Sequence, residues 1–344
     1  MRAKHVFTGF LLALAAIFLA LFICLLLFSA WNRPVTAEQG TAGEVLFSVP
    51  PGESLRRTAS RLAGEGLVRS ELFVCLHARF AGLSLKAGTY RLSPAMRTAE
   101  ILDAIHSGDV AVYRITVPEG LTLSKTAAVF AEAGISAQNF LTAAGDPALL
   151  QEFGIPAATA EGYLFPDTYF VNYGDSAESV VRRMLSTFFE RAETLDGFPG
   201  RGQPLHDRVI LASIVEREYR VAEEAPLIAG VFANRLRINM GLQSCATIEY
   251  ILTEILGQPH PERIGPDALE IRSPYNTYLW AGLPPGPISN PGQTALQAAF
   301  SPADTPCFYF RLNDPVSGTH TFTVSLDDHI EAGREIYLKQ AAGR

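Results

Sequence analysis

The 344-residue chain lacks the features that mark several common kinds of protein. Its four cysteines form no C-x-x-C pair and have no zinc-ligand spacing, so the sequence does not indicate a disulfide scaffold or a zinc module. A disulfide between two of Cys75, Cys245 and Cys307 remains an open alternative. The chain also has no Gly-rich phosphate loop, no G-x-S-x-G elbow and no H-E-x-x-H motif. Its net charge of −7 argues against a nucleic-acid-binding protein, which would show a basic face.

The N-terminal region also lacks charge, and this is its most informative property. Residues 6–31 contain no charged side chain, and a helix needs about 20 such residues to cross a bilayer. A secretory signal has an apolar core of only about 7–15 residues, and only the loose match 35-VTA-37 resembles a cleavage site. We therefore expect an uncleaved transmembrane helix at 6–31 after a short cytoplasmic tail at 1–5. Because Arg2 and Lys4 precede the helix, the N-terminus is expected inside and the rest of the chain outside the cytoplasm.

A polar segment at 32–44 is expected to be a linker, and a weak internal repeat follows it. The copies are 49-VPPGESLRRTASRLAGEGL-67 and 117-VPEGLTLSKTAAVFAEAGI-135. Each predicts a short strand, a turn, a helix capped by Ser54 or Thr122, and a terminating glycine. With a further strand and helix in 86–110, they predict a small α+β subdomain over 45–135. It is either a plain spacer or a module that binds glycan or a partner.

The remainder, 136–344, is predicted to be a larger mixed domain. Residues 136–205 are expected to be mainly helical around 161-EGYLFPDTYFV-171, and two helices follow at 206–220 and 223–237. Residues 238–344 are expected to be rich in loops and strands, with a final helix from about Asp327. The predicted fold class is α+β.

The stretch 211-LASIVEREY-219 places two glutamates at the end of an apolar helix. Glu216 and Glu218 are two residues apart, so they point in very different directions and cannot act as a carboxylate pair on one bond. A single glutamate in apolar surroundings has a raised pKa and can donate a proton to a leaving oxygen, as glycosidic cleavage requires. The alternative is an exposed helix end with local ion pairs.

Seven motifs in order resemble the YceG-like family of endolytic murein transglycosylases. They are KAGTYRL, EGYLFPDTY, LASIVERE, VFANRLRINMGLQ, SPYNTY, GLPPGPISNPG and ALQAAFSP, the last with a downstream HTF. The resemblance implies an N-terminal transmembrane helix in the cell inner membrane, a LysM-like α+β subdomain at 45–135, and a periplasmic mixed α/β catalytic domain at 136–344. It implies that Glu216 is catalytic, with Glu218 as a neighbour in a supporting role.

The reaction implied by the resemblance cleaves the β-1,4 bond between N-acetylmuramic acid and N-acetylglucosamine within peptidoglycan strands. It leaves a 1,6-anhydromuramic acid end and needs one carboxyl group, with no metal or other cofactor. The family also suggests that the enzyme works beside peptidoglycan synthases and terminates nascent strands. Two alternatives stay open: a hydrolase that uses water and a second carboxylate, or a non-catalytic anchored scaffold for glycan or division proteins.

Other positions are assigned as hypotheses from the motifs. Amides bind acetamido groups and tyrosine rings pack on sugars, so substrate contacts are expected from Gln243, Tyr275, Asn276 and Tyr278. The alternative for each is packing or turn formation. Glu161 and Asp167 are candidates for a supporting carboxylate, with structural hydrogen bonding as the more plausible role. One departure stands out, because Ser244-Cys245-Ala246-Thr247 replaces the usual Thr-Asp-Pro-Thr.

Overall fold

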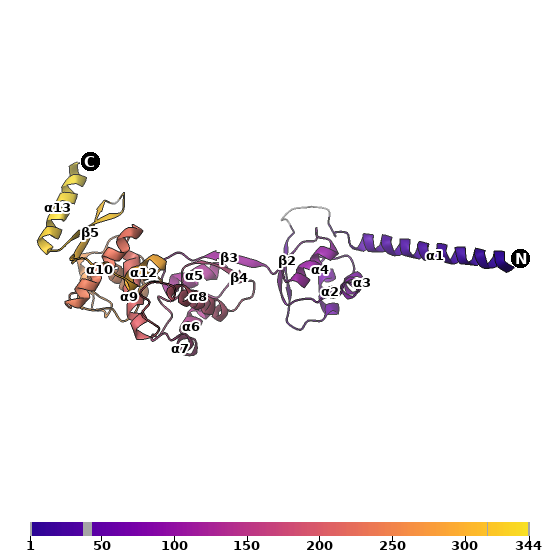
Figure 1. The fold of residues 1–344 in the computed structure, drawn as a ribbon, viewed down its shortest axis with the longest axis horizontal. Helices are drawn as coiled ribbons and strands as arrows, with labels where there is room; N and C mark the ends of the chain where they lie inside the picture. The colour runs from indigo at the N-terminus through magenta and orange to yellow at the C-terminus, as the bar shows by residue number, and fades with distance from the viewer. Residues whose placement is uncertain (1, 37–42, 315, 343–344) are drawn as a thin grey trace. The chain divides into compact units, whose positions relative to one another are not determined.

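The structure is a computed structural model that describes residues 2–36, 43–314 and 316–342. Figure 1 shows the helices and strands of the chain coloured by residue number. Contacts divide the chain into two compact units. The first contains Met1–Tyr113 with Phe170–Gly174, and the second contains Arg114–Tyr169 with Asp175–Arg344. Residues 37–42 of the predicted linker, Met1, and the side chains of the predicted tail lie outside the described part.

The first unit begins with helix α1 (Arg2–Trp31), as its apolar composition predicts. Its segment Leu14–Trp31 is long and apolar enough to cross a membrane, with a mean hydropathy of 2.7. The last turn of the helix packs on the following region, because the Phe28 ring lies 5.2 Å from the Phe73 ring. Length and composition are equally compatible with a membrane anchor and with a signal sequence.

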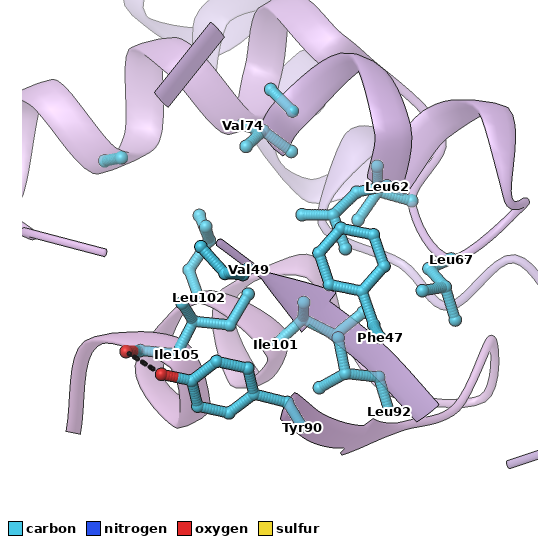
Figure 2. Packing of buried hydrophobic residues seen from close by; sticks show 13 residues of the cluster. Phe47, Val49, Leu62, Leu67, Val74, Tyr90, Leu92, Ile101, Leu102 and Ile105 are labelled. Carbon is cyan, nitrogen blue, oxygen red and sulfur yellow. Dashed lines mark hydrogen bonds between the residues drawn. The ribbon is translucent and has the colours of Figure 1, made fainter. Parts of the chain in front are cut away.

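The rest of the first unit is a two-stranded ribbon packed on three helices. Strand β1 (Val45–Val49) pairs antiparallel with β2 (Gly88–Leu92), and Phe47 lies opposite Tyr90. The helices are α2 (Leu55–Gly64), α3 (Glu71–Phe80) and α4 (Thr98–Ser107). Side chains from all five elements form one buried cluster, shown in Figure 2. Within it the Tyr90 hydroxyl lies 2.7 Å from the Lys86 carbonyl and 3.3 Å from the Ile105 carbonyl, so its proton has an acceptor and the buried phenol is satisfied.

The structure confirms the predicted helix caps of the repeat. The Ser54 side chain accepts from the Arg57 N–H and the Thr122 side chain from the Lys125 N–H, which starts α2 and α5 (Leu123–Glu132). Gly66 and Gly134 follow these helices with φ of 72° and 85°. In that left-handed conformation a side chain is strained, so glycine ends both helices.

The two copies of the repeat do not share one compact unit. The prediction placed 45–135 in one subdomain, whereas the contacts divide the chain after Tyr113. The second copy folds with the second unit because α5 packs on α6 (Ala137–Ala144), where the Phe130 and Phe140 rings stack 5.2 Å apart. Strand β3 (Val112–Thr116) pairs with β4 (Thr168–Asn172).

The second unit is mainly helical. After α6 come α7 (Pro147–Phe153), α8 (Ala177–Ala192), α9 (Gln203–Glu218), the 3₁₀ turn η1 (Ala222–Glu224), α10 (Ala225–Arg237), α11 (Cys245–Tyr250), the π turn η2 (Ile251–Ile255), the 3₁₀ turn η3 (Pro266–Glu270) and α12 (Gln293–Phe300). The hairpin β5 (Tyr309–Asp314) and β6 (Thr319–Thr323) precedes α13 (Leu326–Ala342). The hairpin and final helix were predicted, whereas α11 and α12 fall where loops and strands were expected. The described fold is mixed α and β.

Candidate active site

Helix α9 brings Glu216 out of the core of the second unit. The seven residues from Val209 to Val215 are all buried, so this stretch is enclosed on every side. Glu216 follows immediately and is half-buried. The apolar run of the sequence therefore ends at a carboxyl group that still has access to solvent.

Glu216 accepts a hydrogen bond of 2.9 Å from the Gly292 N–H. Gly292 is the N-cap of α12, so the carboxyl group lies at the positive end of that helix. The hydroxyl of Tyr219, the C-cap residue of α9, also favours the ionised form of Glu216 and lowers its pKa. These contacts fix the orientation of the carboxyl group.

The pKa of Glu216 is raised from its ordinary 4.5 to about 7. Burial is the main cause, because it removes water from the charged form, and the charge of Glu119 acts in the same direction. The Gly292 N–H, the Tyr219 hydroxyl and the Arg217 charge oppose the rise. A carboxyl group with this pKa carries a proton in part of its population near neutral pH and can both donate and accept one.

The proline-rich loop 282–292 is tied to α9 by buried hydrogen bonds. The Ser213 hydroxyl accepts from the Ile288 N–H at 3.0 Å, and the Ser289 hydroxyl donates to the Ser213 carbonyl at 3.0 Å. Asn290 is fully buried, and its side-chain oxygen accepts from the N–H groups of Gly162 and Leu164. These hydrogen bonds hold the loop in place where it leads to Gly292, the residue that binds Glu216.

Glu218 lies among different partners, as its spacing from Glu216 predicts. Its carboxylate accepts a hydrogen bond from the Ser244 hydroxyl, and burial raises its pKa. The charges of His320, Arg235 and Arg217 oppose that rise. Glu218 thus belongs to a polar cluster with Ser244, Arg235 and His320.

His320, in the HTF motif, is held within that cluster. Its ring Nδ1 lies 2.7 Å from a Glu224 oxygen, and its backbone N–H donates to the same carboxylate at 3.0 Å. The contact joins β6 to η1, the turn that follows α9. This arrangement supports a positioning role for the motif.

Glu161 and Asp167 have structural partners. Glu161 is buried, and both its oxygens accept from the Leu123 N–H, at 2.9 and 3.1 Å, at the start of α5. Burial raises its pKa to about 8. Asp167 accepts from the Thr168 N–H at 2.7 Å and lies 3.6 Å from the Arg191 guanidinium. Among the described contacts, neither carboxylate shares a hydrogen-bond partner with Glu216.

The four predicted substrate contacts have different environments. Asn276 is fully buried, and its amide bonds to the carbonyls of Leu269 and Ile271 and to the Tyr278 N–H. That geometry favours the turn-forming alternative for Asn276. Tyr275 is half-buried, and its ring lies 5.1 Å from that of Tyr250.

Tyr278 is half-buried like Tyr275, and Gln243 is the most accessible of the four. Gln243 is exposed and has a φ of 52°, a strained conformation for a residue other than glycine. Its N–H donates to the Thr277 carbonyl at 3.0 Å, so its side chain is presented from a fixed backbone. Strain of this kind is concentrated at functional sites.

The unusual Cys245 is exposed at the start of α11. Its sulfur lies 3.1 Å from the Tyr278 hydroxyl, where the family motif would place an aspartate. Cys75, Cys245 and Cys307 are all free, so the disulfide left open by the sequence does not form among them.

Glu119 is the residue near Glu216 that the sequence analysis did not select. It lies in the turn of the second repeat copy, and its carboxylate contacts the backbone of Gly292. The first repeat copy has Pro51 at the same place, so an acidic residue is not needed to form this turn. This difference between the two copies is the sequence feature that could have identified Glu119 as a candidate.

Comparisons with known proteins agree with the motifs. The model of the YceG-like family matches residues 47–335. An endolytic murein transglycosylase of Bacillus subtilis (strain 168) is 31% identical over 325 residues, which cover 89% of this chain and 88% of the relative. A Streptococcus pneumoniae protein (strain D39) of the same name is 29% identical over 83% of this chain, but the match covers only 57% of its length.

A solved structure supports the same assignment. The crystal structure of a YceG-like protein from Listeria monocytogenes matches with a TM-score of 0.55 and 29% identity. The match covers 84% of this chain and 98% of the Listeria chain. The chain belongs to the YceG-like family.

Proposed function

We propose that this chain is a lytic transglycosylase that cleaves peptidoglycan glycan strands internally. The observation that carries the proposal is Glu216, a half-buried carboxyl group with its pKa raised to about 7, held by the Gly292 N–H. The B. subtilis and S. pneumoniae relatives are named endolytic murein transglycosylases, and the YceG-like model covers most of the chain.

The proposed mechanism uses one carboxyl group twice. Protonated Glu216 donates its proton to the glycosidic oxygen as the bond between that oxygen and C1 of N-acetylmuramic acid breaks. The acetamido group of the same sugar stabilises the positive charge at C1, as in substrate-assisted glycosidases. Ionised Glu216 then takes the proton of the C6 hydroxyl, whose oxygen forms the new bond to C1. The attack is intramolecular and therefore benefits from proximity.

The surroundings of Glu216 fit both halves of this cycle. Burial favours the protonated form before cleavage, whereas the Gly292 N–H and the Tyr219 hydroxyl stabilise the carboxylate formed afterwards. Gln243, Tyr275 and Tyr278 remain proposed substrate contacts. Asn276 would act by shaping the segment that carries the two tyrosines, and Glu218 by positioning Ser244.

A hydrolase that uses water is the second candidate. The observation that favours it is the position of the Glu119 carboxylate beside Gly292, which binds Glu216. It gives the site a second carboxylate, which could activate water. The two earlier candidates for that role, Glu161 and Asp167, are engaged elsewhere.

Product analysis on purified peptidoglycan tests the proposal. The full-length protein in detergent should release fragments with 1,6-anhydromuramic acid ends, identified by mass spectrometry. Glu216→Gln should lower the rate by at least about 10³-fold, because its amide cannot donate the proton. Reducing ends would instead support the hydrolase, and undiminished cleavage by Glu216→Gln would remove Glu216 as the acid.

We further propose that α1 anchors the protein in the cytoplasmic membrane with the second unit outside. The first unit is then the LysM-like part of the family. Mass spectrometry of the mature protein from membranes should find an N-terminus ahead of α1. A mature N-terminus near residue 37 would instead identify α1 as a cleaved signal.

A further inference from the structure

We propose that Glu119 is a positioning residue for this reaction. Its carboxylate, which lies beside Gly292, keeps Glu216 in the proton-carrying form that must meet the glycosidic oxygen. This inference deepens the proposed function and rests on it. It assigns a role to a residue outside the seven motifs that mark the family.

The turn that carries Glu119 is fixed against α9. The Gly120 N–H donates to the Asn290 carbonyl at 2.9 Å, and the Arg217 guanidinium donates to the Gly120 carbonyl at 3.3 Å. A Cβ built on Gly120, whose φ is 75°, would lie 3.6 Å from Cγ of Glu216. The backbone next to Glu119 therefore packs directly on the Glu216 side chain.

The Glu119 side chain reaches the residue that binds Glu216. A Cβ built on Gly292 would lie 1.9 Å from Oε1 of Glu119 and 2.3 Å from its Cδ. Gly292 in turn donates its N–H to Glu216. The two carboxyl groups thus meet at one glycine, and any larger residue at 292 would displace Glu119.

The charges around Glu216 make the effect of Glu119 distinct. Arg217 of the same helix and Tyr219, its C-cap residue, both favour the ionised form of Glu216. Arg217 is itself paired with Glu249 at 2.7 Å, and Glu249 also contacts His260 at 3.1 Å. From the 117–120 turn it faces Glu119, whose negative charge raises the pKa of Glu216 and of Tyr219. Glu119 is the nearby charge that opposes ionisation.

The repeat provides an internal comparison for this position. Gly52 and Gly120 have almost the same φ, 77° and 75°, so the two copies make a similar turn. The first copy precedes its glycine with Pro51 and the second with the exposed Glu119. The acidic side chain therefore serves something other than the turn.

The test is the pH dependence of kcat for Glu119→Gln in the full-length protein, with purified peptidoglycan as substrate. Activity that needs protonated Glu216 falls as the pH rises through its pKa. Removing the neighbouring negative charge should move this alkaline limb to lower pH by roughly one unit, while the activity below the limb is retained. Glu119→Asp keeps the charge and should restore the limb. Glu132→Gln, an exposed carboxylate on α5, is the matched control and should leave it unchanged.

A Glu119→Gln profile that superimposes on that of the wild type would overturn the inference. If the variant is folded by circular dichroism but inactive at every pH, the Glu216 carboxyl can be titrated by NMR in ¹³C-glutamate-labelled protein. A lowered pKa supports the inference and an unchanged pKa overturns it. If the wild type gives anhydro products but Glu119→Gln has the same alkaline limb as the wild type, this inference alone is wrong. If the wild type gives no anhydro products, the proposed function itself is wrong.

Discussion

At the scale of single residues, the same chemistry has two uses in this protein. Glu161 and Glu216 are both carboxyl groups whose pKa is raised mainly by burial, to about 8 and about 7. Both oxygens of Glu161 accept from the first N–H of α5, whereas Glu216 is half-exposed and lies near the Glu119 carboxylate. A raised pKa therefore separates structural from functional acids only together with access and geometry.

The buried Glu161 gives a prediction for stability. Its folded pKa of about 8 exceeds the unfolded value near 4.5, so the folded state binds the extra proton between these values. The contribution is complete below the unfolded pKa and is lost as the pH rises through about 8, with a slope of up to about 1.4 kcal/mol per pH unit. Urea unfolding at a series of pH values should show this decline in the wild type.

Glu161→Gln should flatten the decline of the free energy of unfolding with pH. The difference should be clearest between the pKa values of Glu216 and Glu161, because Glu216 contributes a slope of the same sign at lower pH. The amide oxygen can still accept from the Leu123 N–H, so the variant should fold. An equally steep decline in the variant would show that another group binds the proton.

The sequence predicted residue roles where the signal was local. The split between Glu216 and Glu218 follows from helical spacing, and their different partners confirm it. The approach of Glu119 to Gly292 could not be predicted, because it depends on how a turn in the second repeat copy packs against the N-terminus of α12. Spacing along one element carries no information about such a contact.

At the scale of elements, side-chain caps mark some of the predicted helices but not all, since α9 and α10 were predicted from their patterns and begin without one. The helices α2 and α5 begin at Ser54 and Thr122, whose side chains bind the first turn, and both are followed by glycine. By contrast, the missed helix α12 begins at Gly292, which has no side chain to cap it and whose own N–H is bound by Glu216 from α9. The signal that starts α12 therefore lies in the fold and not in its own sequence.

The loop before α12 gives the prediction at this scale. The buried Asn290 amide accepts from two N–H groups of the EGYLFPD segment and donates to the Leu121 carbonyl at 3.0 Å. Asn290→Ala leaves these groups buried without partners and should lower the free energy of unfolding by roughly 2–4 kcal/mol. It should also reduce kcat, because the loop leads directly to Gly292. Urea unfolding and turnover measure the two effects.

The matched variant is Asn290→Asp, which keeps the acceptor for Gly162 and Leu164 but loses the donor to Leu121. It should fall between the wild type and Asn290→Ala in stability. If Asn290→Ala is as stable as the wild type, the amide is not what ties the three segments together.

At the scale of the whole molecule, the boundary between the two units is the main difference from the sequence-based prediction. The repeat suggested that both copies belong to one subdomain, because the two copies have the same local pattern. Their contacts differ: the first copy packs on β1 and β2, and the second packs on α6 and on the loop around Asn290. Local similarity predicts the shape of a segment, whereas the residues on its buried face decide which core it joins.

The chain divides into two compact units, each with its own core, so we expect two unfolding transitions in calorimetry of the full-length protein. Tyr90 is fully buried in the first unit, and its hydroxyl bonds to the carbonyls of Lys86 and Ile105. Tyr90→Phe should lower the stability of that unit by about 1–2 kcal/mol and shift one transition only. Asn290→Ala should shift the other. Peptidoglycan cleavage should survive Tyr90→Phe at temperatures below the transition of the second unit, since Glu216, Gly292 and Glu119 all lie in that unit. A single transition that moves with both variants would show instead that the two cores unfold as one cooperative unit.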